Sequence, residues 1–72
     1  MRALPVDVVR ALVAIVDCRG FTRAAESLGR TQPTISLQIR RLEELIGAPV
    51  FDNTSRLSLS ARGRTVLDYG RK

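Results

Sequence analysis

The chain has 72 residues, of which 44% are hydrophobic, and its formal net charge is +5. A chain of this length forms one small domain and buries only about 60% of the surface that its unfolded form exposes. These values exclude a disordered segment, and they also exclude a large core with a deep substrate pocket. A partner subunit would be one way to cover the apolar surface that remains.

Positive charge is concentrated in two stretches of the chain. Residues 19–41 carry five arginines and one acid, residues 42–52 carry three acids and no base, and residues 56–72 carry five basic residues and one acid. Eleven of the twelve basic residues are arginines, and guanidinium groups bind phosphate and guanine through paired hydrogen bonds. Nucleic acid is therefore the favoured partner, and a generic solubilising surface is the alternative.

Several function classes lack the residues that they need. There is no histidine, and the single cysteine, Cys18, can form neither an internal disulfide nor a zinc site. We interpret Cys18 as a small buried hydrophobe in a protein of the reducing cytoplasm. Glu43 and Glu44 are adjacent, so on a helix they point about 100° apart and cannot flank one substrate. We therefore expect no enzyme activity, no metal, no cofactor and no small-molecule site within this chain.

The sequence also gives no sign of a membrane protein. No signal peptide is evident, and no segment approaches the ~20 apolar residues that cross a bilayer.

The first predicted helix runs from Val6 to Asp17, with Pro5 in its first turn, and Gly20 is expected to end it. Its expected buried face has helical spacing and consists of Val9, Leu12, Val13 and Val16. A further apolar row widens this face and consists of Val8, Ala11 and Ile15. The wide stripe is consistent both with a well-buried helix and with a surface that meets a second subunit.

The segment from residue 21 to residue 47 predicts two helices joined by a tight turn. Thr22 is expected to cap a helix over Arg23 to Leu28, and Gly29 can adopt the positive φ that ends it. Ala25 is small enough to let two helix backbones cross closely, and Ile35 can fill the crossing. This arrangement is a helix-turn-helix unit, whose second helix reads base edges in the major groove.

The second helix of this unit is predicted to begin after the cap Thr31, with Pro33 in its first turn, and to end at Gly47. Helical spacing defines a core face of Ile35, Ile39, Leu42 and Ile46. The candidate DNA contacts on this helix carry amide, hydroxyl and guanidinium groups, and they are Gln32, Thr34, Ser36 and Arg40. Phosphate contacts are expected at the helix starts, from Thr22, Arg23, Arg30 and Thr31.

Leu37 points outward among these polar residues. Exposed leucines are common on protein surfaces. Two interpretations of Leu37 therefore remain: it contacts a thymine methyl group, or it is an ordinary exposed side chain.

Two short strands and a final helix complete the prediction. Val50–Phe51 and Leu57–Leu59 read as the strands of a hairpin, or wing, in which Arg56 can enter a minor groove or hold a phosphate. Ser60 is expected to cap a helix that runs from Ala61 toward Lys72. The apolar residues of this helix are Val66, Leu67 and Tyr69, and Gly63 and Gly70 permit close approach.

An ordered series of residues carries a resemblance to a known family. The series consists of Phe21-Thr22-Arg23-Ala24-Ala25, Leu28, Gln32-Pro33, Ser36, Ile39, Arg41-Leu42-Glu43, Gly47, Phe51 and Leu59-Ser60-Ala61-Arg62-Gly63. With these residues the chain resembles the N-terminal domain of LysR-type transcriptional regulators over about residues 4–70. Three features depart from the family's pattern: Leu37 replaces a frequent arginine or other polar residue, Asn53 replaces a wing arginine, and the interval from Phe51 to Leu59 looks one residue short.

The resemblance implies a mostly α fold with a small β-hairpin, in which a winged helix-turn-helix (a three-helix core plus the wing) occupies residues 1–59. Residues 60–72 would begin a linker helix through which two chains form a homodimer. The implied DNA contacts are Gln32, Pro33, Thr34, Ser36, Leu37 and Arg56. The implied dimerisation residues are Val66, Leu67, Tyr69 and Gly70.

The expected function is sequence-specific binding of double-stranded DNA by a bacterial transcriptional regulator. Such a regulator would lie in the cytoplasm, associated with the bacterial nucleoid. A winged-helix module that binds proteins and not DNA is the alternative.

Overall fold

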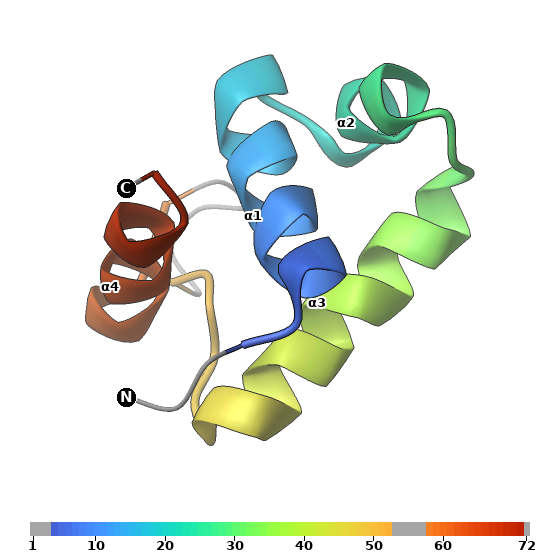
Figure 1. Ribbon diagram of the computed structural model, residues 1–72. Helices are drawn as coiled ribbons and strands as arrows, with labels where there is room; N and C mark the ends of the chain where they lie inside the picture. Colours follow the sequence, from blue (N-terminus) through green and yellow to red (C-terminus); the bar gives the residue numbers. More distant parts are fainter. Residues whose placement is uncertain (1–3, 53–57, 72) are drawn as a thin grey trace.

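The computed structural model describes residues 4–52 and 58–71, and within these residues the chain folds into four helices. They are α1 (Val6–Cys18), α2 (Phe21–Leu28), α3 (Gln32–Ile46) and α4 (Ala61–Gly70). Figure 1 shows α1 in the middle of the domain, with α2 and α3 to one side of it and α4 to the other. The recognition helix expected from the sequence is α3, and the prediction that Gly47 ends it is confirmed, since its last residue is Ile46.

Two glycines end helices as the sequence predicts. Gly29 follows α2 with φ of 68°, and Gly47 follows α3 with φ of 70°. Both values lie in the left-handed region, which glycine enters without the steric penalty of a Cβ atom. The sharp turn between α2 and α3 therefore depends on Gly29.

The end of α1 differs from the prediction. The left-handed residue is Arg19, with φ of 59°, and not Gly20. Because Arg19 already makes the turn, Gly20 is extended and becomes the N-cap of α2, which begins at Phe21. Thr22 consequently lies inside the first turn of α2, and its predicted role as the cap is wrong.

The buried face of α1 is also rotated from the predicted one. Its buried residues are Val8, Val9, Ala11, Leu12 and Ile15. Val13 and Val16 of the predicted row are only half-buried. Apolar residues surround most of this helix, so their spacing alone does not locate the centre of its buried face.

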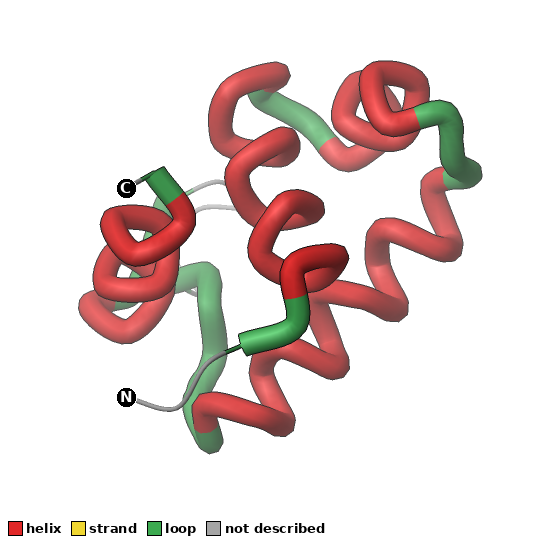
Figure 2. Tube along the Cα trace, viewed as in Figure 1, coloured by secondary structure: helices red, strands yellow, loops and turns green. Residues whose placement is uncertain are grey.

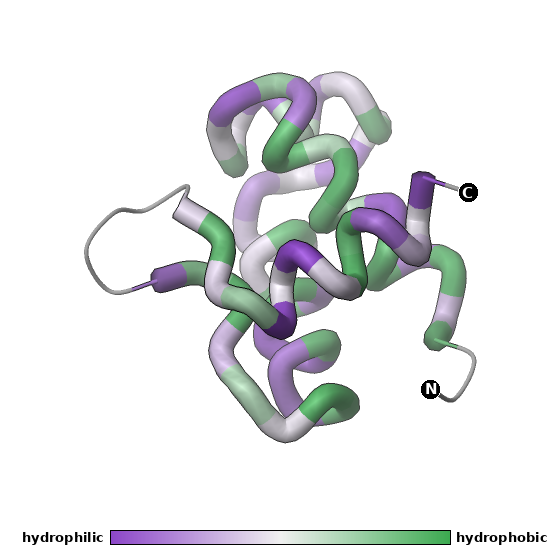
Figure 3. Tube along the Cα trace, turned by 90° about the vertical axis from the view of Figure 1, so that its left-hand side faces the viewer, coloured by the Kyte–Doolittle hydropathy of each residue, from purple (hydrophilic) through white to green (hydrophobic). Residues whose placement is uncertain are grey.

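The core is apolar throughout the part of the chain that the structure describes. Ile35, Ile39 and Leu42 face inward from α3, as predicted, whereas Ile46 is half-buried. Ala24 and Ala25 of α2 are buried in the same core. No polar or charged residue is buried among the described residues. Figure 3 shows hydrophobic and hydrophilic residues alternating along the helices, as expected when each helix buries one face.

The segments on either side of residues 53–57 pair with each other. Phe51 and Leu59 form an isolated antiparallel bridge. The amide of Asp52 donates to the Ser58 carbonyl over 2.6 Å, and the amide of Ser60 donates to the Val50 carbonyl over 2.9 Å. Figure 2 shows no strand in the described residues, so this bridge is the extent of the β-structure there. The predicted turn, Leu57 and Arg56 lie outside the described residues.

The start of α4 is fixed to the segment that precedes the bridge. Ser60 is its N-cap, as predicted, and the Ser60 Oγ accepts from the Gly63 amide over 3.0 Å. The Ser60 hydroxyl lies 2.6 Å from the Pro49 carbonyl, to which it donates. A Cβ atom at Gly63 would lie only 2.2 Å from the Val50 carbonyl oxygen, so the two backbones meet here.

The end of α4 rests on α1. A Cβ atom at Gly70 would lie 2.5 Å from the Cγ1 atom of Val9 and 3.2 Å from the Cγ2 atom of Val13. Arg71 forms an ion pair with Asp17 at the same end of the two helices. Both glycines of α4 thus permit close approach, as the sequence predicts.

Candidate nucleic-acid interface

The side of α3 that faces away from the core is exposed and carries most of the predicted DNA contacts. Gln32, Pro33, Ser36, Leu37 and Arg40 are all exposed, and Thr34 is half-buried. Ile35 is fully buried on the other side of the same helix. The core contacts of α3 therefore hold this polar surface outward, where it is open to a large ligand.

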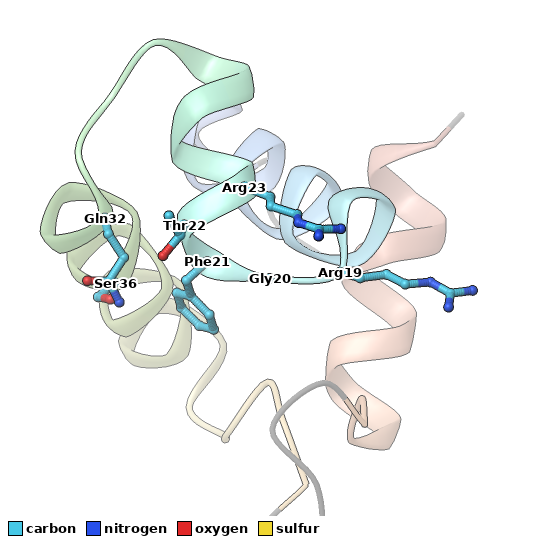
Figure 4. A pocket seen from close by; sticks show the side chains of 7 residues that line it. All are labelled: Arg19, Gly20, Phe21, Thr22, Arg23, Gln32 and Ser36. Carbon is cyan, nitrogen blue, oxygen red and sulfur yellow. The ribbon is translucent and has the colours of Figure 1, made fainter.

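A pocket joins the start of α2 to the start of α3. Thr22 and Arg23 from α2 and Gln32 and Ser36 from α3 are among the residues that line it. Figure 4 shows Gln32 and Ser36 beside Thr22 and Phe21, whereas Arg19 and Arg23 extend away on the other side of the pocket. Four predicted contact residues are therefore brought together from two helices by the tight turn between them.

The α2 start carries unpaired backbone donors in addition to these side chains. Gly20 has no side chain to cap α2, and no side-chain hydrogen bond is made at this helix start. The first amide groups of a helix point along its axis and attract anions. With Arg19 and Arg23 beside them, these amide groups form a surface suited to phosphate oxygens.

Arg19 is a pocket residue that the sequence analysis missed. Arg19 was not among the predicted contacts; in the structure it has a left-handed backbone and lines the pocket. The available signal was the high density of arginine from residue 19 onward.

Two aromatic rings connect the pocket to the bridge region. The ring of Phe21 lies with its centroid 6.0 Å from that of Phe51, at an interplanar angle of 53°. Tilted aromatic pairs at this separation attract each other. Phe51 is also a partner in the bridge with Leu59, so the floor of the pocket and the base of the predicted wing are packed together.

The remaining predicted contacts are placed differently. Thr31 is the N-cap residue of α3, but its side chain makes no capping bond, and its Oγ1 lies 2.9 Å from the Thr34 Oγ1, with which it shares a hydrogen bond. Arg30 is exposed in the turn and lines a separate pocket with Arg10 and Gln38. Arg56 lies outside the described residues, so its predicted contact stays a prediction.

At the acidic C-terminal end of α3, one of the two glutamates is hydrogen-bonded within the domain. The Glu43 Oε2 accepts from the Val50 amide over 3.0 Å, so this carboxylate fixes the segment after α3. Glu44 is exposed. Negative charge repels phosphate, so the N-terminal half of α3 is the part suited to approach DNA.

The predicted dimerisation residues do not form one exposed surface. Val66 is 1% exposed within the domain's own core, and Gly70 lies against Val9. Leu67 is half-buried, and Tyr69 is 40% exposed. Of the four predicted residues, Tyr69 and Gly70 are therefore exposed, Leu67 is half-buried, and Val66 is a core residue.

The described residues contain neither a candidate metal site nor a candidate membrane-spanning helix. No cluster of three or more histidine, cysteine, aspartate or glutamate side chains within residues 4–52 and 58–71 could hold a metal ion. None of the helices in these two ranges has the length and apolar character needed to cross a membrane.

The family model described as bacterial regulatory helix-turn-helix protein, lysR family, matches residues 6–64. The chain belongs to the LysR family. It is a DNA-binding helix-turn-helix domain of the type found in transcriptional regulators, and the resemblance expected from the sequence is confirmed.

Curated relatives of this LysR-family domain carry regulator names. The HTH-type transcriptional regulator DgdR of Burkholderia cepacia is 42% identical over 72 residues, which cover 99% of this chain and 24% of that protein. A probable RuBisCO transcriptional regulator of Gracilaria tenuistipitata var. liui is 44% identical over 73 residues, covering 97% of this chain and 24% of that protein. The chain thus spans about a quarter of the length of these relatives.

Solved structures share the fold of this LysR-family domain. The DNA-binding domain of BenM in complex with catB site 1 DNA matches with a TM-score of 0.84 and 32% identity, covering 94% of this chain and 74% of that chain. Full-length CbnR in complex with its target DNA matches with a TM-score of 0.83 and 25% identity, covering 94% of this chain and 23% of that chain.

Proposed function

We propose that this LysR-family domain binds double-stranded DNA sequence-specifically, with the N-terminal half of α3 in the major groove. The observation that carries the proposal is the exposed row of Gln32, Ser36, Leu37 and Arg40, held outward by the buried Ile35 and Ile39. Amide, hydroxyl and guanidinium groups are the side-chain groups that read base edges in that groove. The structural neighbours BenM and CbnR were solved with DNA, which supports the same use of this fold here.

The phosphate backbone beside that groove would be held at the start of α2. Thr22, Arg23 and Arg19 lie within or beside this uncapped helix start, and Gln32 shares their pocket. Contacts of this kind fix the register of a protein on the duplex, whereas base contacts determine sequence preference. The domain would thus bind phosphate with the groups at the start of α2 and contact bases with the groups on α3.

A wing would add a third contact. The bridge between Phe51 and Leu59, with a backbone hydrogen bond on either side of it, has the pattern of a hairpin base. Residues 53–57 would form its tip, and Arg56 would reach the minor groove or the adjacent phosphates. The aromatic contact between Phe21 and Phe51 supports this placement, because it ties the hairpin base to the pocket.

The functional unit would be a homodimer. A winged domain over residues 1–59 would be joined to a linker helix that begins at residue 60, and the linker helices of two chains would pair through Tyr69 and Leu67. Two copies of α3 would then meet major grooves about 34 Å apart, or a multiple of that spacing, on a pseudo-palindromic site. As part of a bacterial regulator, the dimer would act in the cytoplasm on nucleoid DNA.

The proposal is tested by selection of bound duplexes from a randomised DNA pool, followed by an electrophoretic shift with the selected site. We expect enrichment of a pseudo-palindromic sequence and a preference for it over unrelated DNA. Equal binding of selected and random duplexes would contradict sequence-specific recognition. An absence of binding even at low salt would favour the alternative of a protein-interaction module.

The variant Arg40→Ala, tested in the same selection, separates two roles of that side chain. If Arg40 binds phosphate, affinity falls uniformly for all sequences, and if it reads guanine, the preference at one position is relaxed. Either result requires Arg40 at the DNA, so unchanged affinity and preference would remove Arg40 from the interface. Arg71→Ala serves as the control, because Arg71 pairs with Asp17 and follows α4, which lies on the other side of α1 from α3.

A further inference from the structure

Leu37 is unusual among the residues of the proposed DNA-facing surface because its side chain is apolar and open. It is 65% exposed, although leucine stabilises a protein by being buried. The other large apolar side chains with high exposure among the described residues are Val6, Leu45 and Tyr69, and none of them lies in the N-terminal half of α3. No contact within the described domain therefore explains why this position is apolar.

Helix geometry directs Leu37 away from the core. Each residue turns the helix by about 100°, so Leu37 points about 160° away from both Ile35 and Ile39, which are buried. Pro33 and Arg40 are exposed on adjacent turns of the same face. If α3 lies in the major groove as proposed, Leu37 is directed toward its floor, where base edges are exposed.

The major groove offers one kind of apolar group. Adenine, guanine and cytosine present hydrogen-bond donors or acceptors, which a leucine side chain cannot satisfy, whereas thymine also presents a C5 methyl group. A leucine pressed against a polar base edge would remove it from water without a replacement bond, which is unfavourable. Contact with a methyl group removes apolar surface of both partners from water, which is favourable.

We propose that Leu37 is a specificity-determining residue that selects a thymine in each half-site through contact with its C5 methyl group. This inference rests on the proposed function and adds the identity of a base to it. Leu37 lies five residues after Gln32, which is about 7.5 Å along the helix axis, at 1.5 Å per residue. The two side chains also point about 140° apart on the helix, so the thymine would be separate from any base that Gln32 contacts.

The test uses the selected duplex with single thymines replaced by deoxyuridine, which removes the C5 methyl group and leaves every hydrogen-bonding group in place. With the unaltered protein, we expect one thymine per half-site at which this replacement weakens binding about fourfold, the factor that one buried methylene-sized group provides. Replacement of that T·A pair by a C·G pair with 5-methylcytosine should bind more tightly than the same pair with cytosine.

The variant Leu37→Ala identifies the side chain that reads the methyl group. The substitution is on an exposed helix position and alanine favours helix, so the fold should be retained. We expect Leu37→Ala to bind the thymine and deoxyuridine duplexes equally at the sensitive position. The matched control is Leu45→Ala, which removes another exposed leucine from the same helix and should keep the full methyl effect.

The outcomes distinguish this inference from the function on which it rests. Sequence-specific binding with no deoxyuridine-sensitive thymine, or with a methyl effect that Leu37→Ala leaves intact, would overturn the role of Leu37 and retain the proposed function. An absence of sequence preference in the selection would overturn the proposed function itself. These measurements use the whole 72-residue chain.

Discussion

Gly63 occupies a position in this domain where there is no room for a Cβ atom. It lies in the first turns of α4, where a Cβ atom would be 2.2 Å from the Val50 carbonyl oxygen and 3.2 Å from the Cδ2 atom of Leu59. The nearer of these neighbours is backbone, and its carbonyl oxygen already accepts from the Ser60 amide. A side chain at residue 63 would thus separate α4 from the segment that carries the predicted wing.

We predict that Gly63→Ala lowers the free energy of unfolding by about 1–3 kcal/mol, as overpacking does in other cores. Alanine normally stabilises a helix relative to glycine, so a loss here would identify the clash as its cause. Thermal unfolding followed by circular dichroism measures the change, which corresponds to about 4–8 °C for each kcal/mol in a domain of this size. The control Arg64→Ala changes an exposed neighbour on α4 and should shift stability by less than about 0.5 kcal/mol.

At the scale of elements, two helix starts that share a hydroxyl residue at the N-cap are built differently. Ser60 and Thr31 both occupy N-cap positions with extended backbone. The Ser60 side chain accepts from the Gly63 amide, whereas the Thr31 hydroxyl shares a hydrogen bond with Thr34 and caps nothing. The Ser60 side chain therefore fixes the start of α4 within the domain, whereas the start of α3 keeps its backbone donors available for a ligand.

We predict that Ser60→Ala lowers the free energy of unfolding by about 1 kcal/mol, the usual loss when an N-cap hydroxyl is removed. Thr31→Ala should change stability by clearly less, because no capping bond is lost. Urea unfolding of both variants, followed by circular dichroism, measures the difference. Equal losses for the two variants would show that the cap geometry of Thr31 contributes more than its hydroxyl contacts suggest.

Helix ends were predictable where a glycine adopts the left-handed conformation that ends the helix. Gly29 and Gly47 end α2 and α3 with positive φ, as the sequence indicates. The end of α1 was not predictable in this way, because Arg19 enters the left-handed region although Gly20, the easier candidate, is its neighbour. That choice depends on how α2 packs against α1, which local sequence does not encode.

The inward face of α3 and its outward polar face were also predictable, since polar and apolar residues alternate there with clear helical spacing. The face of α1 was not, because valine, alanine and isoleucine occur on most of its sides. Similarly, the spacing along α4 did not distinguish Val66, which is buried in the domain core, from Tyr69, which is 40% exposed. Helical spacing predicts which side chains form an apolar face. It does not predict which of them the core of the domain covers.

At the scale of the whole molecule, α2 and α3 lie on one side of α1 and α4 lies on the other. The arginines and polar groups of the pocket lie at the starts of α2 and α3, and the ion pair between Arg71 and Asp17 lies at the far end of α4. Figure 1 shows α1 between α3 and α4, so it holds both surfaces in one rigid arrangement. Charges on the two sides should therefore contribute unequally to DNA binding.

We predict that Arg19→Ala makes the plot of log affinity against log salt concentration shallower by about one unit, because one phosphate contact is lost. Fluorescence anisotropy of a labelled duplex at several salt concentrations measures the slope. Arg71→Ala removes the same charge from the end of α4, where Arg71 pairs with Asp17, and should leave the slope unchanged. A reduction of the same size in both variants would mean that net charge, and not the position of Arg19, controls the salt dependence.

The position of Tyr69 has a consequence for optical spectroscopy. The chain contains no tryptophan and one tyrosine, so intrinsic emission excited in the near ultraviolet arises from a single ring on α4. Tyr69 is 40% exposed, and its helix α4 lies on the opposite side of α1 from α3. If two chains pair through α4 as proposed, the quantum yield of Tyr69 and its quenching by iodide should therefore change with protein concentration, without a dye.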